Sequence, residues 1–231
     1  PGALEMYRKV RATKKPMRLV TNAASASIPQ LSESLSRMQI PFDESEIISS
    51  GSLFPAFARE NGIREAFYIG RPGGTSFLEA GGVKISENPA EATVIVSAAG
   101  KEDSLFERAL QILKRPGARL VVLNPDAWAP RIGKPRDPVS GAYAHRLYLE
   151  AKPQVFYFGK PFRQIFDSAL STLPRPMRTV MIGDTLATDI GGAKNAQIDA
   201  ALLVGRNEPT AELAGDEELL GIRPDYYLTA I

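Results

Sequence analysis

Short apolar runs alternate with helical patterns along most of this chain. Each run is only a few residues long and is bounded by turn-forming residues, as is typical of β-strands. The predicted strands cover residues 17–20, 65–70, 92–97, 119–123, 154–158, 179–182, 200–204 and 225–228. Strands that alternate with helices favour a parallel sheet covered by helices, so the sequence predicts an α/β protein with a doubly wound, Rossmann-like parallel sheet.

Three segments between the predicted strands repeat apolar residues at helical spacing. The stripes are Ile28, Leu31, Leu35 and Met38; Leu105, Phe106, Ala109, Leu110 and Leu113; and Phe162, Ile165, Phe166, Ala169 and Leu170. Ser27 and Gln30 have the spacing of a capping box, which predicts where the first helix begins. Pro161 suits the first turn of the third helix, because the first backbone N–H groups of a helix have no partner within it.

The middle of the chain has a strand-and-helix series of its own. Residues 70–150 lie between a glycine-rich segment, residues 70–75, and Pro153. We therefore predict two domains: a discontinuous core formed by residues 1–69 and 151–231, and an inserted α/β domain formed by residues 70–150.

Composition excludes several classes of site. The 231 residues include no Cys and one His, which excludes disulfides, thiolate metal sites, a cysteine nucleophile and a multi-histidine zinc site within this chain. No apolar run is long enough to cross a bilayer, and no signal-peptide pattern opens the sequence. We expect a cytoplasmic protein with no membrane partner; whether it forms a homo-oligomer is left open.

Basic residues crowd the start of the chain, although the net charge is only +2. They are Arg8, Lys9, Arg11, Lys14, Lys15 and Arg18. No aromatic residues interleave with them for base stacking, and no nucleic-acid-binding motif accompanies them. We interpret the cluster as a solvated helix face and expect no nucleic acid as a partner.

Two aspartates follow the predicted strand 179–182. Asp184 and Asp189 lie five residues apart, across a turn that leads into a helix, so both carboxylates can point to the carboxyl end of the sheet, where ligands bind in such folds. Carboxylate oxygens suit Mg²⁺, which takes few protein ligands and keeps several waters. The structural alternative is that Asp184 fills a turn and Asp189 stabilises a helix N-terminus. Alone, the spacing favours neither.

Two further strand ends present groups suited to phosphate. Lys160 follows the strand 154–158, and its ammonium could offset the charge of an aspartate and a phosphate brought together. Thr21 and Asn22 follow the strand 17–20 and offer a hydroxyl and an amide to phosphate oxygens. The structural alternatives are a solvated loop lysine and a polar strand-to-helix turn.

The order of these groups resembles the haloacid dehalogenase (HAD) superfamily, in particular its class IIA branch of 4-nitrophenyl, sugar-phosphate and nucleotide phosphatases. The segments that carry the resemblance are Pro1-Gly2-Ala3, Val20-Thr21-Asn22, Asn124-Pro125-Asp126, Gly159-Lys160-Pro161 and residues 182–193. It extends over essentially the whole chain. It implies a Rossmann-like core with an inserted α/β cap domain between the second and third motifs, the interval that residues 70–150 occupy.

The resemblance implies a role for each candidate residue. Thr21 would bind the transferring phosphoryl group, with the Asn22 amide beside it. Lys160 would orient the nucleophile and balance the charge of the phosphate. Asp184 would be the principal Mg²⁺ ligand, and Asp189 would support the metal site directly or through water.

A cap loop that faces the substrate in this branch resembles residues 124–130, which makes Asn124 a candidate substrate-binding residue. Pyridoxal-phosphate phosphatases are similar but carry a histidine where this sequence has Ala129 and an asparagine where it has Ala23. Both departures disfavour pyridoxal phosphate as the substrate. The single histidine, His145, is interpreted as structural or solvated.

The first motif of the family, two aspartates separated by one residue, is expected upstream of Pro1. The resemblance makes its first acid the nucleophile that forms an aspartyl-phosphate and its second the general acid and base. We therefore expect a Mg²⁺-dependent phosphatase that hydrolyses a small phosphorylated metabolite and whose nucleophile lies outside these residues. The alternative is a non-catalytic relative that binds a phosphorylated ligand or a protein partner.

Overall fold

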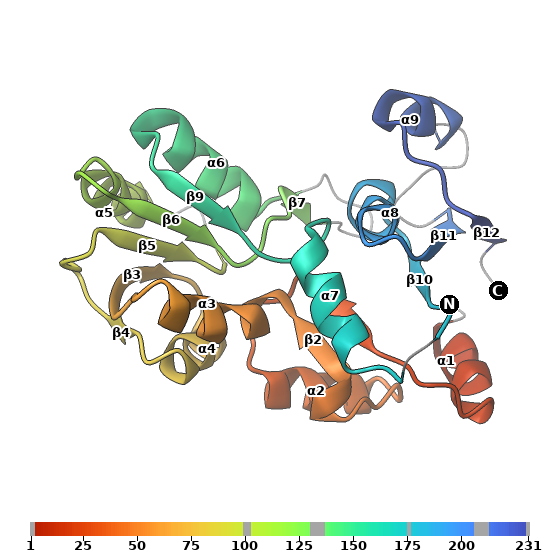
Figure 1. The fold of residues 1–231 in the computed structure, drawn as a ribbon. Coiled ribbons are helices and arrows are strands. Elements are labelled where there is room, and N and C mark those ends of the chain that lie inside the picture. Colours follow the sequence, from red (N-terminus) through yellow and green to blue (C-terminus); the bar gives the residue numbers. More distant parts are fainter. Residues whose placement is uncertain (1–2, 99–102, 130–136, 175–176, 206–212, 230–231) are drawn as a thin grey trace.

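Parallel β-sheets flanked by helices form the computed structural model of this protein (Figure 1). The structure describes residues 3–98, 103–129, 137–174, 177–205 and 213–229. The helices are α1 (Ala3–Ala12), α2 (Ile28–Arg37), α3 (Phe54–Glu60), α4 (Thr75–Ala80), α5 (Asp103–Leu113), α6 (Ser140–Ala151), α7 (Arg163–Ser171), α8 (Gly191–Asn195) and α9 (Leu213–Leu220). The strands are β1 (Leu19–Thr21), β2 (Ile47–Ser49), β3 (Glu65–Ile69), β4 (Lys84–Ile85), β5 (Thr93–Val96), β6 (Arg119–Val122), β7 (Trp128–Ala129), β8 (Asp137–Pro138), β9 (Gln154–Tyr157), β10 (Val180–Gly183), β11 (Asp199–Val204) and β12 (Tyr226–Thr229).

The predicted α/β class is confirmed, and each predicted strand is present within two residues of its expected ends. The three apolar stripes lie on α2, α5 and α7, except that Met38 directly follows α2 and Phe162 directly precedes α7, and the Ser27–Gln30 capping box begins α2. Sequence reasoning missed β2, in which only Ile47 and Ile48 are apolar, because a two-residue run is too short to indicate a strand.

The largest sheet has five parallel strands in the order β4-β3-β5-β6-β9. Two of its strands lie outside the predicted inserted domain, residues 70–150. Strand β3, which pairs with β5, precedes that range, and β9, which pairs with β6, follows it. Composition and turn residues do not report which strands pair, so a boundary based on them left out β3 and the edge strand β9.

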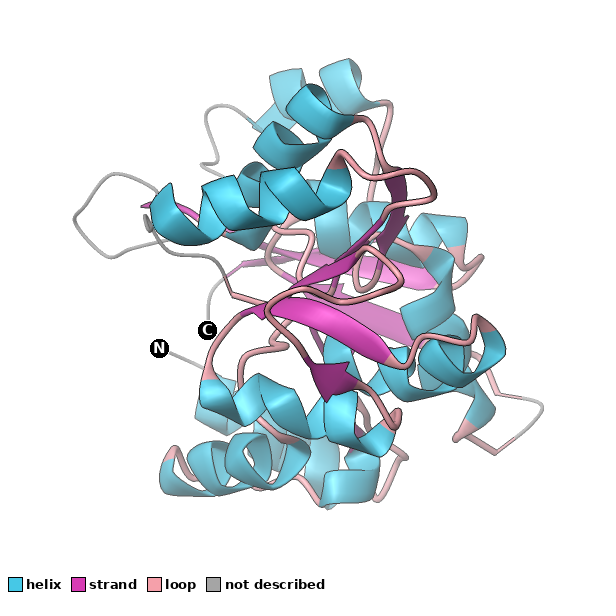
Figure 2. Ribbon diagram, turned by 90° about the vertical axis from the view of Figure 1, so that its left-hand side faces the viewer, coloured by secondary structure: helices cyan, strands magenta, loops and turns pink. Residues whose placement is uncertain are grey.

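Side chains of the five-stranded sheet are buried on both faces. Helices lie on either side of its strands (Figure 2). Val94 and Leu120 pack in one cluster with residues of α5 and α6, whereas Ile95 and Val121 pack in another with residues of α3 and α4. Burial on both faces explains why these strands are continuous apolar runs rather than alternating patterns.

Two smaller parallel sheets, β1-β2 and β10-β11-β12, share one core. Ile48 of β2 and Leu202 of β11 belong to a single buried cluster, together with Ile165 and Phe166 of α7. In the described residues, however, β1 pairs only with β2, and β10 pairs only with β11 on one side. The two sheets are therefore neighbours through their packing but are not joined by strand pairing.

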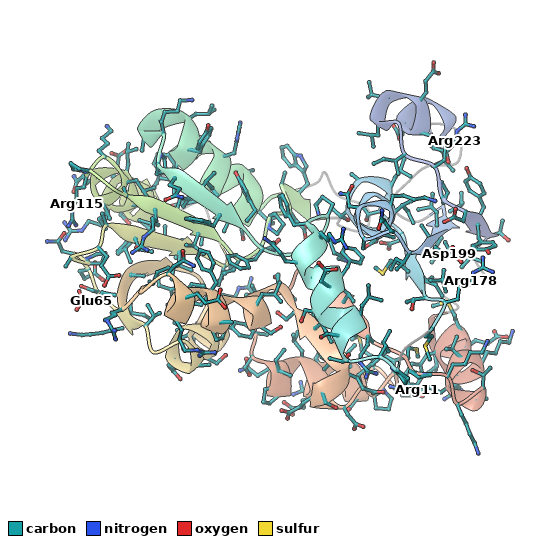
Figure 3. The ribbon with its side chains drawn as sticks, in the orientation of Figure 1. Arg11, Glu65, Arg115, Arg178, Asp199 and Arg223 are labelled. Atoms are coloured by element: carbon teal, nitrogen blue, oxygen red, sulfur yellow. The ribbon has the colours of Figure 1, made fainter. Side chains whose placement is uncertain are left out.

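Helix α1 lies beside the β1-β2 unit and is fixed there by Arg11, which Figure 3 labels. The Arg11 guanidinium bonds both carboxylate oxygens of Glu46, with Nη1 2.7 Å from Oε1 and Nη2 2.5 Å from Oε2, and it lies over the rings of Tyr7 and Phe42. One member of the basic cluster is thus a packing residue, whereas Lys9 pairs on the surface with Glu5. In the described part of the chain, no helix is both long and apolar enough for a membrane span.

Candidate active site

Lys160 and Asp189 form the centre of the candidate site. The Lys160 Nζ lies 2.5 Å from Asp189 Oδ1, and the Asp189 side chain is only 6% exposed. Lys160 follows β9, whereas Asp189 lies in the π-helical turn Leu186–Ile190 after β10. The two predicted strand ends therefore meet, which makes Lys160 an ion-pair partner rather than a solvated loop lysine.

The second oxygen of Asp189 holds the turn that follows β10. Asp189 Oδ2 accepts hydrogen bonds from the backbone N–H groups of Asp184 and Thr185, each at 3.1 Å. A Cβ on Gly183 would lie 2.2 Å from the Asp189 Cβ, so only glycine allows this close approach. Both oxygens of Asp189 thus have protein partners.

Asp184 has more acceptor capacity left than Asp189. The one donor found for its carboxylate in the described residues is the Thr185 hydroxyl, 3.3 Å from Oδ1, and the residue is half-buried at the end of β10. A carboxylate in that setting suits Mg²⁺. The described residues contain no group of three or more His, Cys, Asp or Glu side chains that could hold a metal ion. Within the described residues, Asp184 is the carboxylate of this group that could hold a metal ion.

Asn22 is buried and binds the backbone of Lys160 from both sides. Its Oδ1 accepts a hydrogen bond from Lys160 N at 2.7 Å, and its Nδ2 donates to Lys160 O at 3.0 Å and to Asp126 Oδ1 at 2.8 Å. An amide nitrogen carries two N–H groups, and both are used here. The side chain therefore offers no further N–H to a phosphate.

Gly159 makes the approach of Asn22 possible. Its φ is +103°, and a Cβ at this position would lie 2.4 Å from Asn22 Oδ1. Only glycine combines that backbone conformation with that space. A glycine directly before Lys160 is visible in the sequence. The reason that a glycine is needed there, the close approach of Asn22, is visible only in the structure.

Thr21 is the last residue of β1 and is half-buried. Its hydroxyl accepts a hydrogen bond from Ala23 N at 3.1 Å, so it takes part in the predicted polar turn. A hydroxyl that accepts one bond can still donate one, and Thr21 retains the O–H expected to bind phosphate.

The loop after β6 brings Asp126 into contact with Asn22, whereas the contact of Asn124 is local. Asn124 Oδ1 accepts a hydrogen bond from Asp126 N at 3.0 Å, which is a local turn contact. Burial raises the pKa of Asp126, whereas the hydrogen bond from Asn22 and the positive charge of Lys160 oppose that rise. Sequence reasoning named Asp126 only as part of a motif and missed its contact with Asn22. The expected substrate loop extends to Pro130, which lies outside the described residues.

The strands that precede these side chains belong to three different sheets in the described residues. β1, β9 and β10 lie in the two-, five- and three-stranded sheets respectively. Their ends are nevertheless joined by the contacts of Asn22 and Lys160.

Arg178 and Asp199 form an ion pair on the three-stranded sheet, with 2.7 Å between Nε and Oδ2 (Figure 3). The pair joins the residues that precede β10 to the first residue of β11.

His145 lies on an exposed part of α6 and stacks on Tyr148, with 6.5 Å between the ring centroids. No contact in the described residues joins it to Lys160 or Asp184. Tyr143 is buried and packs edge-on against Phe106, so it belongs to the core. These contacts agree with a structural or solvated role for the histidine.

Comparisons with known proteins match this chain at both ends and over its whole length. Residues 1–84 match a model described as haloacid dehalogenase-like hydrolase, and residues 157–231 match one described as HAD-hydrolase-like. Haloacid dehalogenase-like hydrolase domain-containing protein 2 of Bos taurus is 27% identical over 99% of this chain and 84% of that protein. Glycerol-3-phosphate phosphatase of Gallus gallus is 25% identical over 100% and 83%. The solved p-nitrophenyl phosphatase from Archaeoglobus fulgidus superposes with a TM-score of 0.85 at 25% identity, covering 99% of this chain and 88% of that one.

Proposed function

This chain belongs to the haloacid dehalogenase superfamily, and on that premise we propose that it is a Mg²⁺-dependent phosphatase of the class IIA type that hydrolyses a small phosphorylated metabolite. It is a phosphoric monoester hydrolase, like the named relatives. The observation that carries the finer proposal is the buried ion pair of Lys160 and Asp189 beside the carboxylate of Asp184, which accepts one hydrogen bond at 3.3 Å.

Each residue of this group has a task in phosphate chemistry. The Lys160 ammonium, fixed by Asp189, offsets the negative charge of a phosphate that approaches a carboxylate. The Thr21 hydroxyl donates to a phosphate oxygen, and Asp184 holds Mg²⁺. The metal supplies charge neutralisation at the phosphate oxygens. Because Asp189 already binds Lys160 and two backbone N–H groups, we assign it to the support of the site rather than to the metal itself.

The nucleophile is not among these residues. Asp189 is fully engaged, and Asp184 is needed for the metal. We propose that the nucleophile is an aspartate of a segment N-terminal to Pro1, on a strand that lies between β1 and β10. Two observations support that position: each of these strands has an unpaired edge in the described residues, and both pack on one core, β1 through Val20 and β10 through Met181.

The reaction then has two balanced steps. The aspartate oxygen bonds to phosphorus while the ester oxygen leaves and takes a proton from a neighbouring acid, which gives an aspartyl-phosphate. Water then attacks this phosphorus and loses a proton to the same acid, which releases phosphate and the free carboxylate. Lys160 and Thr21 bind the phosphoryl oxygens in both steps.

We propose that the inserted cap is larger than residues 70–150 and comprises the whole five-stranded sheet with its helices. The pairing of β3 with β5 and of β9 with β6 supports this division. The cap loop at residues 124–126 then reaches Asn22 of the core through the 2.8 Å bond from Asn22 to Asp126.

The test is hydrolysis of 4-nitrophenyl phosphate by the full-length protein, with and without Mg²⁺. We expect metal-dependent turnover, and we expect Asp184→Asn to weaken Mg²⁺ binding by about tenfold or more in calorimetry, because a neutral amide replaces the charged ligand that the described residues offer. Asp43→Asn, a matched change on the surface, leaves Mg²⁺ affinity unaltered. Unchanged Mg²⁺ affinity in Asp184→Asn would remove Asp184 from the metal site. Phosphate binding without turnover of any ester in a broad panel would favour the non-catalytic alternative.

A further inference from the structure

The backbone of Lys160 lies outside regular secondary structure and depends on one side chain. Strand β9 ends at Tyr157 and α7 begins at Arg163, so Lys160 lies in the connection. Its backbone N–H and C=O both bond to the amide of Asn22, at 2.7 and 3.0 Å. Buried backbone groups need partners, and Asn22 supplies both of them for this residue. The position of the Lys160 side chain thus depends on where the Asn22 amide is held.

Only one orientation of the Asn22 amide satisfies its hydrogen-bond partners. Its oxygen faces the Lys160 N–H, and its nitrogen faces two acceptors, Lys160 O and Asp126 Oδ1. Turning the amide over would place an NH₂ group against an N–H and an oxygen against two oxygens. An ionised Asp126 carboxylate can only accept hydrogen bonds, so it faces the Asn22 Nδ2 and stabilises this orientation of the amide.

Asp126 is itself fixed by the five-stranded unit. Its backbone N bonds Asn124 Oδ1 at 3.0 Å, and its backbone O accepts from Gly141 N, at the start of α6, at 2.9 Å. A Cβ on Gly141 would lie 2.1 Å from Pro125 O, so the loop and the helix are closely packed. The carboxylate that orients Asn22 therefore moves only with this loop and this helix.

We propose that Asn22 is a positioning residue for Lys160 and that Asp126 orients it, so that the loop at residues 124–126 sets the affinity of the site for phosphate. The proposal rests on the proposed function only in giving Lys160 the task of binding phosphate. Asn22 and Asp126 act through the lysine and do not themselves contact the phosphate. When the loop is withdrawn, the Asn22 amide loses its orienting acceptor, and phosphate binds more weakly.

The test exchanges the two side chains in the full-length protein and measures binding of inorganic phosphate by calorimetry. Asn22→Asp replaces a donor by a carboxylate that faces both Lys160 O and Asp126, and we expect a loss of affinity of about tenfold or more. Asp126→Asn keeps an acceptor for Asn22, and we expect a loss below about threefold. The double exchange restores a donor–acceptor pair between the two positions, so it recovers part of the loss in Asn22→Asp.

Asn61→Asp is the matched control, since the Asn61 amide is exposed and its Nδ2 donates to Phe57 O at the end of α3, away from Lys160. It leaves phosphate affinity as in the unmodified protein. Asp126→Ala removes the orienting acceptor but leaves both bonds between Asn22 and Lys160, and we expect it to weaken phosphate binding by about three- to tenfold, less than Asn22→Asp. Melting temperatures and Mg²⁺ affinity are measured alongside; a positioning effect weakens phosphate binding while Mg²⁺ affinity is unchanged.

Two results would overturn the proposal. One is normal phosphate affinity in Asp126→Ala, which would show that Asn22 needs no orienting acceptor. The other is a double exchange whose fold-loss of phosphate affinity equals the product of the fold-losses in Asn22→Asp and Asp126→Asn, since the effects of independent sites combine in that way. Because phosphate binding is measured without turnover, a protein that binds phosphate as described but hydrolyses no ester would contradict the proposed function and leave this inference intact.

Discussion

Replacing Gly159 by alanine should damage both stability and phosphate binding, because two separate constraints meet at this residue. Its φ of +103° is a conformation that side-chain-bearing residues rarely adopt. A Cβ would also lie 2.4 Å from Asn22 Oδ1 and 3.0 Å from Ser50 Cβ. The first constraint is local to the backbone, whereas the second acts on the side chain that positions Lys160.

The magnitude follows from adding the two costs. Backbone strain of this kind costs about 1–3 kcal/mol, and overpacking of a buried site costs about 1–3 kcal/mol more. Gly62 provides a matched control: its φ is +62°, and nothing lies within 4 Å of a Cβ built there. Gly62→Ala therefore costs only about 1–2 kcal/mol. We expect Gly159→Ala to be less stable than Gly62→Ala by about 2 kcal/mol, because both variants strain the backbone but only Gly159→Ala also overpacks a buried site.

Thermal unfolding of the two variants measures this difference. For a chain of this size, a gap of about 2 kcal/mol lowers the melting temperature of Gly159→Ala by about 4–8 °C relative to Gly62→Ala. Phosphate affinity falls in Gly159→Ala alone, since only that variant displaces Asn22. Equal melting temperatures together with equal phosphate affinities would refute the close packing of Gly159 against Asn22.

Two further predictions concern the Arg11–Glu46 ion pair and the buried hydroxyl of Ser50. The hydrogen bonds from Arg11 lower the pKa of Glu46 from its usual value of 4.5, so the pair stabilises the fold above that value and the stabilisation is lost as the pH falls through the lowered pKa. Glu46→Gln should therefore cost about 1–2 kcal/mol in urea unfolding at pH 7, and a gap to the unmodified protein that does not narrow below about pH 4.5 would contradict this reasoning. Ser50 is fully buried, and its hydroxyl has no hydrogen-bond partner in the described residues. Ser50→Ala should therefore leave stability unchanged or raise it by up to about 1 kcal/mol, and a loss of more than about 1 kcal/mol would reveal a partner beyond those residues.

The elements that could be predicted from the sequence are those whose signal is local. The capping box of α2 and the apolar runs of β5 and β6 depend on a few adjacent residues and were placed to within a residue or two. Strand order is a different matter, because it depends on which apolar faces meet after the chain has turned. The pairing of β9 with β6 therefore placed the strand before Lys160 in the five-stranded sheet, which no local pattern indicated.

The same limit applies to the candidate site, in which residue types were predictable but their partners were not. Glycine before Lys160 and glycine before Asp184 were both visible in the sequence. Gly159 is required by the close approach of Asn22, which is distant in the chain. Gly183 is required by the close approach of Asp189 in the turn that follows it. Asp126 was not selected as a site residue, because its importance comes from Asn22, which is more than a hundred positions away.

The structure distinguishes the roles of Asp184 and Asp189, which their spacing in the sequence does not. Two carboxylates five residues apart could equally both bind a metal or both be structural. Once one of them accepts an ammonium at 2.5 Å and two backbone N–H groups at 3.1 Å, its remaining acceptor strength is low and its negative charge is largely balanced. The other, with one weak donor at 3.3 Å, keeps its charge for a cation. The division also fixes the lysine, because an ammonium that is bound to a buried carboxylate is held in place before a phosphate arrives and needs little reorganisation when it does.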